Sequence, residues 1–201
     1  MIKNIIFDFG DVFLNLDKTA PFQLLSERGI ERLTFEDEQI LVEYEVGKIS
    51  TEAVVSHFKE AYEILPEDFK IIWNSMLLDF PKHRLDFLKN LKEKHPYHLI
   101  LLSNTNDMHI EWVKSNWGMP LYNEFKSCFD QFYLSHEIHL RKPDASIYHF
   151  VLNENNLLAQ ETVFIDDTPA NTEAAKELGI HTWNINPKTE DVIHLFSKLD
   201  L

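Results

Sequence analysis

Acidic and polar side chains stand at the ends of three apolar runs in this chain of 201 residues. Asp8 ends the first run, Ser103 and Asn104 end the second, and Asp166 and Asp167 end the third. A short apolar run predicts a buried strand. Ligands of open parallel sheets bind beyond the carboxyl ends of the strands. We therefore expect these side chains to meet at one edge of a sheet.

Several carboxylates at one place repel one another and raise their own pKa values unless a cation lies among them. Ligands that are all oxygen favour a hard ion such as Mg²⁺. The hydroxyl of Ser103 and nearby backbone amides could then hold a phosphate oxygen. Lys142, in the segment RKPD, could supply the positive charge that a transferring phosphoryl group needs. The pattern as a whole predicts phosphoryl chemistry with Mg²⁺ as cofactor.

Each part of this pattern, taken alone, also has a structural interpretation. Asp8 would cap the turn that follows it, and the later acidic pair would cap a helix. The Ser-Asn pair would be a turn, and Lys142 would be an ordinary solvated lysine. The joint occurrence, in this order and at these strand ends, is more specific than any single part.

The elements that must position these side chains follow from hydrophobic spacing and capping residues. Residues 17–80 show four helical segments and no strand, with helix starts at Pro21, Thr34, Ser50 and Pro66. Further along the chain, helices are predicted at 82–94, 107–117, 144–152 and 171–178, with a last one capped by Thr189. Strands are predicted at 99–102, 132–134, 163–165 and 182–185.

Strands that alternate with helices predict an α/β fold with a parallel, Rossmann-like three-layer sheet. The helical segments then form an insertion after the first strand. We expect two units, an α/β core of residues 1–16 and 81–201 and a helical cap of residues 17–80.

Composition limits the classes of partner. The formal net charge is −14, from 33 acidic and 19 basic residues, and such a field repels nucleic acid without excluding a small phosphorylated metabolite. Cys128 is the only cysteine, which favours a reducing compartment. Apolar runs are too short to cross a membrane, so a cytoplasmic protein is expected. No sequence pattern indicates an oligomeric state.

The order Asp8, Ser103, Lys142 and the acidic pair resembles the four motifs of the haloacid dehalogenase-like (HAD) hydrolase superfamily, along nearly the whole chain. Residues 17–80 resemble that family's small helical (C1) cap. The segments SHEIHLRKPDASIY and VFIDDTPANTEAAKELGI are most similar to a bacterial subgroup of sugar-phosphate phosphatases. That subgroup includes an α-D-glucose-1-phosphate phosphatase.

The resemblance implies a role for each matching residue. Asp8 would be the nucleophile and would form an aspartyl-phosphate. Ser103 and the amide of Asn104 would bind the phosphoryl group, and Lys142 would offset its charge. The implied function is Mg²⁺-dependent hydrolysis of a small phosphorylated metabolite, such as a sugar phosphate.

The same resemblance implies a set of metal ligands. Mg²⁺ would be held by the carboxylate of Asp8, the backbone carbonyl of Gly10 and the acidic pair. Within that pair Asp167 is the expected principal ligand, with Asp166 beside it.

Gly10 is the main departure from the family's pattern, because phosphatases of the family usually carry there an Asp that acts as general acid and base. Asp11 lies one place later and is a candidate substitute. Loss of such a group lowers rates by about 10²- to 10⁴-fold. The departure favours an ester with a good leaving group, such as an anomeric sugar phosphate. A smaller departure is His139, where the resemblance implies Gly.

Two rival functions remain open. A metal-independent 2-haloacid dehalogenase would also use Asp8, to attack carbon, but the adjacent acidic pair favours a cation. A catalytically weak domain that binds a ligand or partner is favoured by Gly10. The segment HEIH lacks the HExxH spacing of a zinc site.

Overall fold

Five short strands form one parallel sheet in the computed structural model, which describes residues 1–199. Their order across the sheet is β3-β2-β1-β4-β5. The strands are β1 (Asn4–Phe7), β2 (His98–Ser103), β3 (Gln131–Leu134), β4 (Thr162–Asp166) and β5 (His181–Asn184). Because β1 lies between β2 and β4 and runs parallel to both, the carboxyl ends of these strands share one edge of the sheet.

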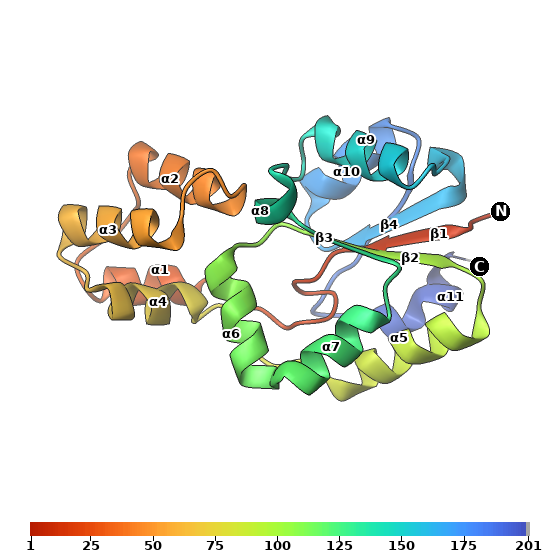
Figure 1. The fold of residues 1–201 in the computed structure, drawn as a ribbon, viewed down its shortest axis with the longest axis horizontal. Helices are drawn as coiled ribbons and strands as arrows, with labels where there is room; N and C mark the ends of the chain where they lie inside the picture. The colour runs from red at the N-terminus through yellow and green to blue at the C-terminus, as the bar shows by residue number, and fades with distance from the viewer. Residues whose placement is uncertain (200–201) are drawn as a thin grey trace.

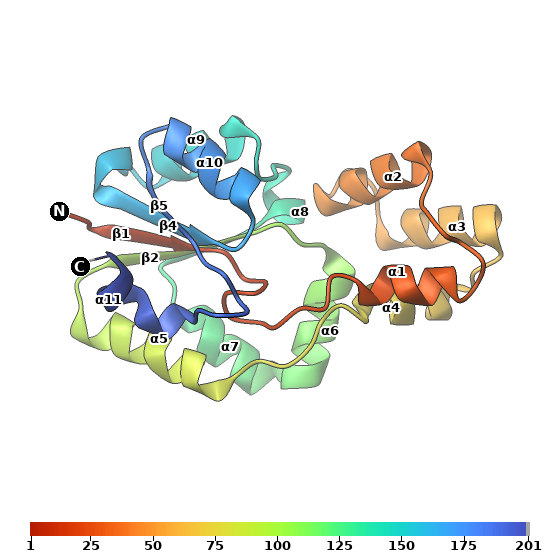
Figure 2. The same cartoon turned by 180° about the vertical axis from the view of Figure 1, so that it is seen from behind.

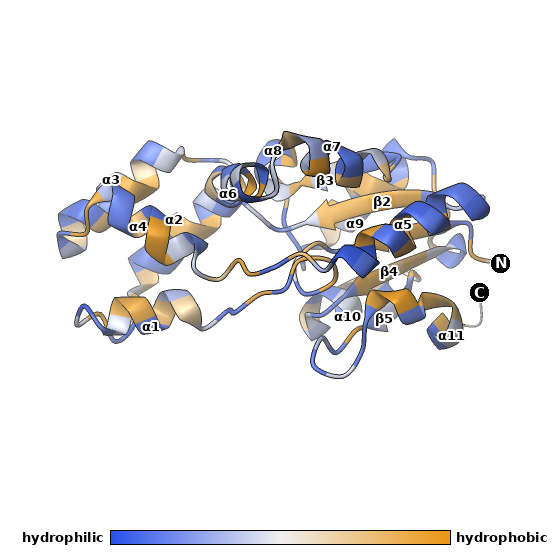
Figure 3. Cartoon of the chain, turned by 90° about the horizontal axis from the view of Figure 1, so that it is seen from below, coloured by the Kyte–Doolittle hydropathy of each residue, from blue (hydrophilic) through white to orange (hydrophobic). Residues whose placement is uncertain are grey.

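Both faces of the sheet are buried, so its central strands are apolar along their whole length. Side chains alternate across β1, with Ile5 and Phe7 in one apolar cluster and Ile6 in another with Ile100 and Phe164. Figure 3 shows the apolar strands between helices whose outer faces are polar. The sheet is therefore the middle layer of three.

Helices cover the two faces of the sheet (Figures 1 and 2). One face carries α5 (Lys82–Lys94), α7 (Met119–Ser127) and α11 (Leu195–Leu199), and the other carries α9 (Ala145–Glu154) and α10 (Pro169–Glu177). Nearer the carboxyl edge lie α6 (Asp107–Trp117) and α8 (Ser135–Ile138). Short 3₁₀ turns occur at Ala159–Glu161 and Val192–His194. No helix within residues 1–199 has both the length and the apolar character needed to cross a membrane.

Four helices between β1 and α5 lie beyond the carboxyl edge of the sheet (Figure 2). They are α1 (Ala20–Ser26), α2 (Phe35–Glu45), α3 (Thr51–Tyr62) and α4 (Pro66–Asn74). They share an apolar cluster of their own, which is joined by Met108 of α6 and contains Leu25, Ile30, Tyr44, Val54, Val55, Phe58, Ile64, Phe69 and Ile72. These helices occupy the interval in which the sequence predicts a cap.

The two segments that connect these helices to the sheet run side by side. The amide of Asn15 donates to the carbonyl of Asp79 at 3.0 Å, and the amide of Leu78 donates back to Asn15 at 3.0 Å. The amide of Asp17 donates to the carbonyl of Met76 at 2.8 Å. The helical unit is therefore joined to the sheet by a hydrogen-bonded pair of segments.

The structure differs from the sequence prediction at two places. The prediction omitted α7 and α8; Gly118, with φ of 76°, ends α6 so abruptly that α7 begins at the next residue. The predicted final helix is present as α11, but the prediction that Thr189 caps it was wrong. The side chain of Asp191 accepts from the amide of Ile193 at 3.2 Å, so the helical turn starts later.

Asp37 is the buried polar centre of the helical unit. Its carboxylate accepts from the Thr34 amide at 2.7 Å and lies 2.6 Å from Nε2 of His57, and the hydroxyl of Tyr62 also donates to it. The Asp37 amide donates in turn to the hydroxyl oxygen of Thr34, which completes a capping box at the start of α2. Burial raises the pKa of Asp37, but the hydrogen bonds from Tyr62, His57 and Thr34 outweigh burial. The net effect lowers the pKa to about 2.

Replacing Asp37 with Ala is expected to lower the free energy of unfolding by about 3 kcal/mol, because the donors of Thr34, His57 and Tyr62 lose their buried acceptor. The depressed pKa means that this stabilisation is fully present above about pH 4 and is lost as the pH falls through about 2. Urea denaturation at pH 7 measures the difference. Glu36→Ala, an exposed change in the same turn, should shift stability by no more than about 0.5 kcal/mol. Equal losses of stability in the two variants would contradict the role of Asp37 as a stabilising hydrogen-bond acceptor.

Candidate active site

The carboxyl ends of the central strands bring the sequence-predicted acids together. Asp8 follows β1, and Asp166 ends β4, directly beyond the pairing of Phe7 with Ile165. One carboxylate oxygen from each of Asp8, Asp166 and Asp167 lies within 4.8 Å of the others. Ser103 ends β2 at the same edge of the sheet. Side chains that are far apart in sequence thus form one polar cluster.

Lys142 lies in the middle of this cluster and is 1% exposed. Its Nζ is 2.7 Å from Oδ1 of Asp8, 2.7 Å from Oδ2 of Asp166 and 2.8 Å from the carbonyl oxygen of Leu102. The side chain of Asn104 bonds both the amide and the carbonyl of Lys142, at 2.9 and 2.8 Å. The lysine therefore reaches three strand ends from a loop that Asn104 fixes.

Asp166 is saturated by protein donors. It is fully buried, and it accepts from the Thr168 amide at 2.7 Å and from Nδ2 of Asn171 at 3.0 Å, in addition to Lys142. These bonds hold its carboxylate against the lysine. Asp166 is thus placed to orient Lys142 more than to bind a ligand directly.

Asp167 faces the opposite way, toward the cavity in front of the sheet. Its Oδ2 is 2.5 Å from Nζ of Lys18, which is half exposed and lies 3.0 Å from Oδ2 of Asp11. Lys18 enters from the segment that leads to α1. Asp167 therefore has the access that a metal ligand needs, and its partner Lys18 is a half-exposed side chain.

Burial and like charge shift the titration of these groups. Burial and, to a smaller extent, the charge of Asp166 raise the pKa of Asp8, whereas Lys142 lowers it. The net result is a pKa raised to about 7. Burial also raises the pKa of Asp167, although Lys18 lowers it. Burial lowers the pKa of Lys142, but the charges of Asp166 and Asp8 outweigh it and the net shift is upward. A cation placed among the carboxylates would keep them all ionised. The donor set fits Mg²⁺, which prefers carboxylate and carbonyl oxygens.

Gly10 and Asp11 are arranged very differently from each other. Gly10 lines the cavity, and a Cβ added to it would come 2.6 Å from Cδ1 of Leu16. Asp11 has φ of 56°, its Oδ1 accepts from the Leu16 amide at 3.0 Å, and its Oδ2 is the one that contacts Lys18. The carboxylate of Asp11 is thus engaged by its own loop and by Lys18, and Asp11 is not among the residues that line the cavity.

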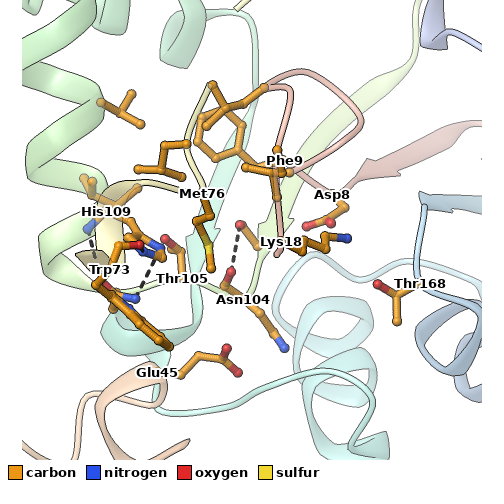
Figure 4. A pocket seen from close by; sticks show the side chains of 18 of the residues that line it. Asp8, Phe9, Lys18, Glu45, Trp73, Met76, Asn104, Thr105, His109 and Thr168 are labelled. Atoms are coloured by element: carbon orange, nitrogen blue, oxygen red, sulfur yellow. Dashed lines mark hydrogen bonds between the residues drawn. The ribbon is translucent and has the colours of Figure 1, made fainter. Parts of the chain in front are cut away.

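A cavity of about 340 Å³ lies between the sheet edge and the helical unit. The core contributes Asp8, Ser103 and Asn104 to its lining, and the helical unit contributes Glu45 and Trp73 (Figure 4). The volume suits a phosphoryl group together with a small organic group.

The sequence pattern of one known family, described as haloacid dehalogenase-like hydrolase, matches residues 5–185. The chain belongs to the HAD-like hydrolase family. This agrees with the resemblance seen in the four motifs, and it supports the polar cluster at the sheet edge as the candidate active site of a hydrolase.

Individual relatives are similar over nearly the whole hydrolase. A D-ribitol-5-phosphate phosphatase of Bacteroides thetaiotaomicron is 32% identical, with 91% of each chain covered. A HAD family enzyme of the same organism, solved with magnesium and inorganic phosphate, is 33% identical with a TM-score of 0.83, over 98% of this chain and 100% of that one. A predicted HAD-like family hydrolase of Porphyromonas gingivalis is 26% identical with a TM-score of 0.83, over 99% and 98%. The narrower resemblance to glucose-1-phosphate phosphatases stays a prediction.

Two residues that bond the carboxylates of this cluster were not predicted from the sequence. Asn171 stands five residues after Asp166, in the first turn of α10, a position from which a side chain can return to the preceding strand end. Its spacing could have indicated the contact. Lys18 carried no local signal, because only the course of the connecting segment brings it to Asp167.

Replacing Lys142 with Met is expected to abolish hydrolysis and to destabilise the protein by about 3–5 kcal/mol at pH 8, because Asp8 and Asp166 remain buried without a counter-charge. Burial raises the pKa of Asp8, and the variant lacks the lowering effect of Lys142, so the destabilisation should shrink as the pH falls from 8 to 5 and Asp8 takes up a proton. Urea denaturation across this pH range tests it. Lys188→Met, an exposed change, is the control. A destabilisation that does not vary with pH would contradict the explanation that unpaired buried charge causes it.

Proposed function

We propose that this hydrolase is a Mg²⁺-dependent phosphatase that acts on a small phosphorylated metabolite, in the class of sugar and polyol phosphates. The observation that carries the proposal is the approach of Asp8, Asp166 and Asp167 to within 4.8 Å of one another, with buried Lys142 paired with Asp8 and Asp166. The similar enzyme solved with magnesium and inorganic phosphate, and the relative named D-ribitol-5-phosphate phosphatase, support the same reaction class.

Asp8 is the proposed nucleophile. Its carboxylate attacks phosphorus, the bond from phosphorus to the ester oxygen breaks, and the alcohol leaves as the aspartyl-phosphate forms. Water then cleaves the aspartyl-phosphate and releases inorganic phosphate. Lys142 holds Asp8 in place and offsets negative charge beside it. The Ser103 hydroxyl and the Asn104 amide, at the same sheet edge, are the proposed phosphoryl ligands.

The proposed metal ligands are the carboxylates of Asp8 and Asp167 and the carbonyl of Gly10. Asp166 lies in the same cluster, but its bonds to Lys142 and Asn171 favour a positioning role. When bound, Mg²⁺ would supply positive charge that eases the approach of an anionic phosphate to an anionic nucleophile.

Proton transfer to the leaving group is the step for which this chain is least equipped. Gly10 has no side chain, and the carboxylate of Asp11 is engaged by the Leu16 amide and Lys18. We propose that Asp11 does not replace the usual acid in this arrangement, and that the enzyme favours esters whose alcohols leave readily. Helices α1–α4, within residues 17–80, are the proposed cap that limits water around the reaction.

Hydrolysis of p-nitrophenyl phosphate should require Mg²⁺ and should disappear in Asp8→Asn. Asp167→Ala should lose hydrolysis together with Mg²⁺ binding measured by calorimetry, because it removes a carboxylate of the cluster that lines the cavity. Asp86→Asn, an exposed change on α5, is the matched control. Retained activity in Asp167→Ala would overturn the metal assignment.

The rival functions give different results in the same experiment. Halide release from a 2-haloacid without metal would identify a dehalogenase that uses Asp8. Neither halide release nor phosphate release would favour a binding domain.

The double change Gly10→Asp with Asp11→Gly should raise kcat on esters with poor leaving groups by about 10-fold or more, because it restores an acid beside Asp8. Gly suits position 11, where φ is 56°. The new side chain meets Cδ1 of Leu16, so the same change should be made with Leu16→Ala as well, and Leu16→Ala alone is the control. A gain confined to good leaving groups, or no gain in either background, would show that proton transfer does not limit the rate.

A further inference from the structure

Glu45, the last residue of α2, brings a carboxylate into the cavity from the helical unit. Figure 4 shows it beyond Asn104, on the side away from Asp8 and Lys18. The other charged side chains that line the cavity are Asp8, Asp167 and Lys18, and they belong to the reaction centre. Glu45 is therefore the charged group that a leaving group would meet.

The end of α2 is fixed against the core on several sides. Nε of Arg141 donates to Oε1 of Glu45 at 2.8 Å, and the hydroxyl of Ser135 donates to the Glu45 carbonyl at 2.6 Å. The ring of His139 bonds the next carbonyl, that of Val46, at 2.9 Å. These contacts join residues 90 or more positions apart in sequence. The carboxylate is thus held in one place before any substrate arrives.

Arg141 occupies only one of the two carboxylate oxygens. Within residues 1–199, Oε2 of Glu45 receives no hydrogen bond from the protein. An ionised carboxylate oxygen that faces a cavity needs a donor, and an O–H group is a donor of suitable size. A substrate hydroxyl can replace water at this oxygen, whereas a carboxylate or phosphate of a substrate would be repelled by it.

Among the described residues that line the cavity, none at this end is a free cation for a second anionic group; Arg141 does not line the cavity and is paired with Glu45. Burial lowers the pKa of His109 to about 4, so its ring is neutral near pH 7. Both ring nitrogens are also engaged, with Nδ1 3.3 Å from Nδ2 of Asn106 and Nε2 3.2 Å from the Trp73 carbonyl. Lys18, the lysine in the lining, is paired with Asp167 and Asp11.

We propose that Glu45 determines specificity: it accepts hydrogen bonds from hydroxyls of an uncharged, polyhydroxylated leaving group and selects against substrates with a second acidic group. Arg141 is a positioning residue that orients the Glu45 carboxylate. This inference rests on the proposed phosphatase function, because it concerns the alcohol half of the phosphate ester.

The competing explanation is that Glu45 only fastens the helical unit to the core through Arg141. A fastening role would affect every phosphate ester alike, since closure of the cavity is common to all of them. A specificity role would affect only esters whose alcohol reaches Oε2. The two roles are therefore separated by comparing substrates within one variant.

The test uses the full chain with Mg²⁺ and three substrates: ribitol 5-phosphate as the polyol ester, p-nitrophenyl phosphate without hydroxyls, and 3-phosphoglycerate with an added carboxylate. In Glu45→Gln and Glu45→Ala, kcat/KM for ribitol 5-phosphate should fall about 10- to 100-fold, mostly through KM. The value for p-nitrophenyl phosphate should stay within about threefold. Glu45→Lys should raise kcat/KM for 3-phosphoglycerate. Glu38→Gln, an exposed change on the same helix, is the control.

Each contrary result has one meaning. An equal loss on ribitol 5-phosphate and p-nitrophenyl phosphate would show a fastening role and overturn the proposal. An unchanged kcat/KM for ribitol 5-phosphate in the Glu45 variants, or a wild-type preference for 3-phosphoglycerate, would also overturn it while leaving the phosphatase function intact. Wild-type enzyme that hydrolyses none of the three esters would overturn the phosphatase function, and the inference with it.

Discussion

The buried ammonium group of Lys142 is the interaction on which the active site depends. Transfer of an isolated charge into a protein interior is strongly unfavourable, and it is tolerated here because Asp8, Asp166 and the carbonyl of Leu102 all accept from one nitrogen. These acceptors end β1, β4 and β2. The lysine therefore requires three strand ends to be in register, and the parallel sheet supplies that register.

The sheet order divides the chemistry between two parts of the chain. Because β1 is central, the side chain at its end has a neighbouring strand on each side, and the helical insertion follows β1 in the chain. In the proposed mechanism, the core supplies the residues that act on the phosphoryl group. The helical unit contributes Glu45 and Trp73 to the cavity, which makes them the proposed contacts for the alcohol.

Local patterns predicted the parts of this arrangement that local forces produce. The apolar runs that end at Asp8 and Asp166 are buried strands, because a strand covered on both faces has to be apolar throughout. Glu45 could not be distinguished from the other acids of α2, since only the packing of that helix against residues 135–141 gives it a role. His139 shows the same limit: it adopts φ of 58°, a conformation that favours the Gly expected there, and its ring is fixed by a distant carbonyl.

Charge balance offers a physical reason for an uncharged residue at position 10. The cluster around the reaction centre contains four carboxylates, those of Asp8, Asp11, Asp166 and Asp167, and two ammonium groups, those of Lys18 and Lys142. Its formal charge with all groups ionised is therefore −2, which a single divalent cation neutralises. A further ionised carboxylate at position 10 would leave an excess negative charge facing the phosphate. In the proposed mechanism, position 10 thus contributes neutrality instead of a proton, and proton transfer depends on the acidity of the leaving alcohol.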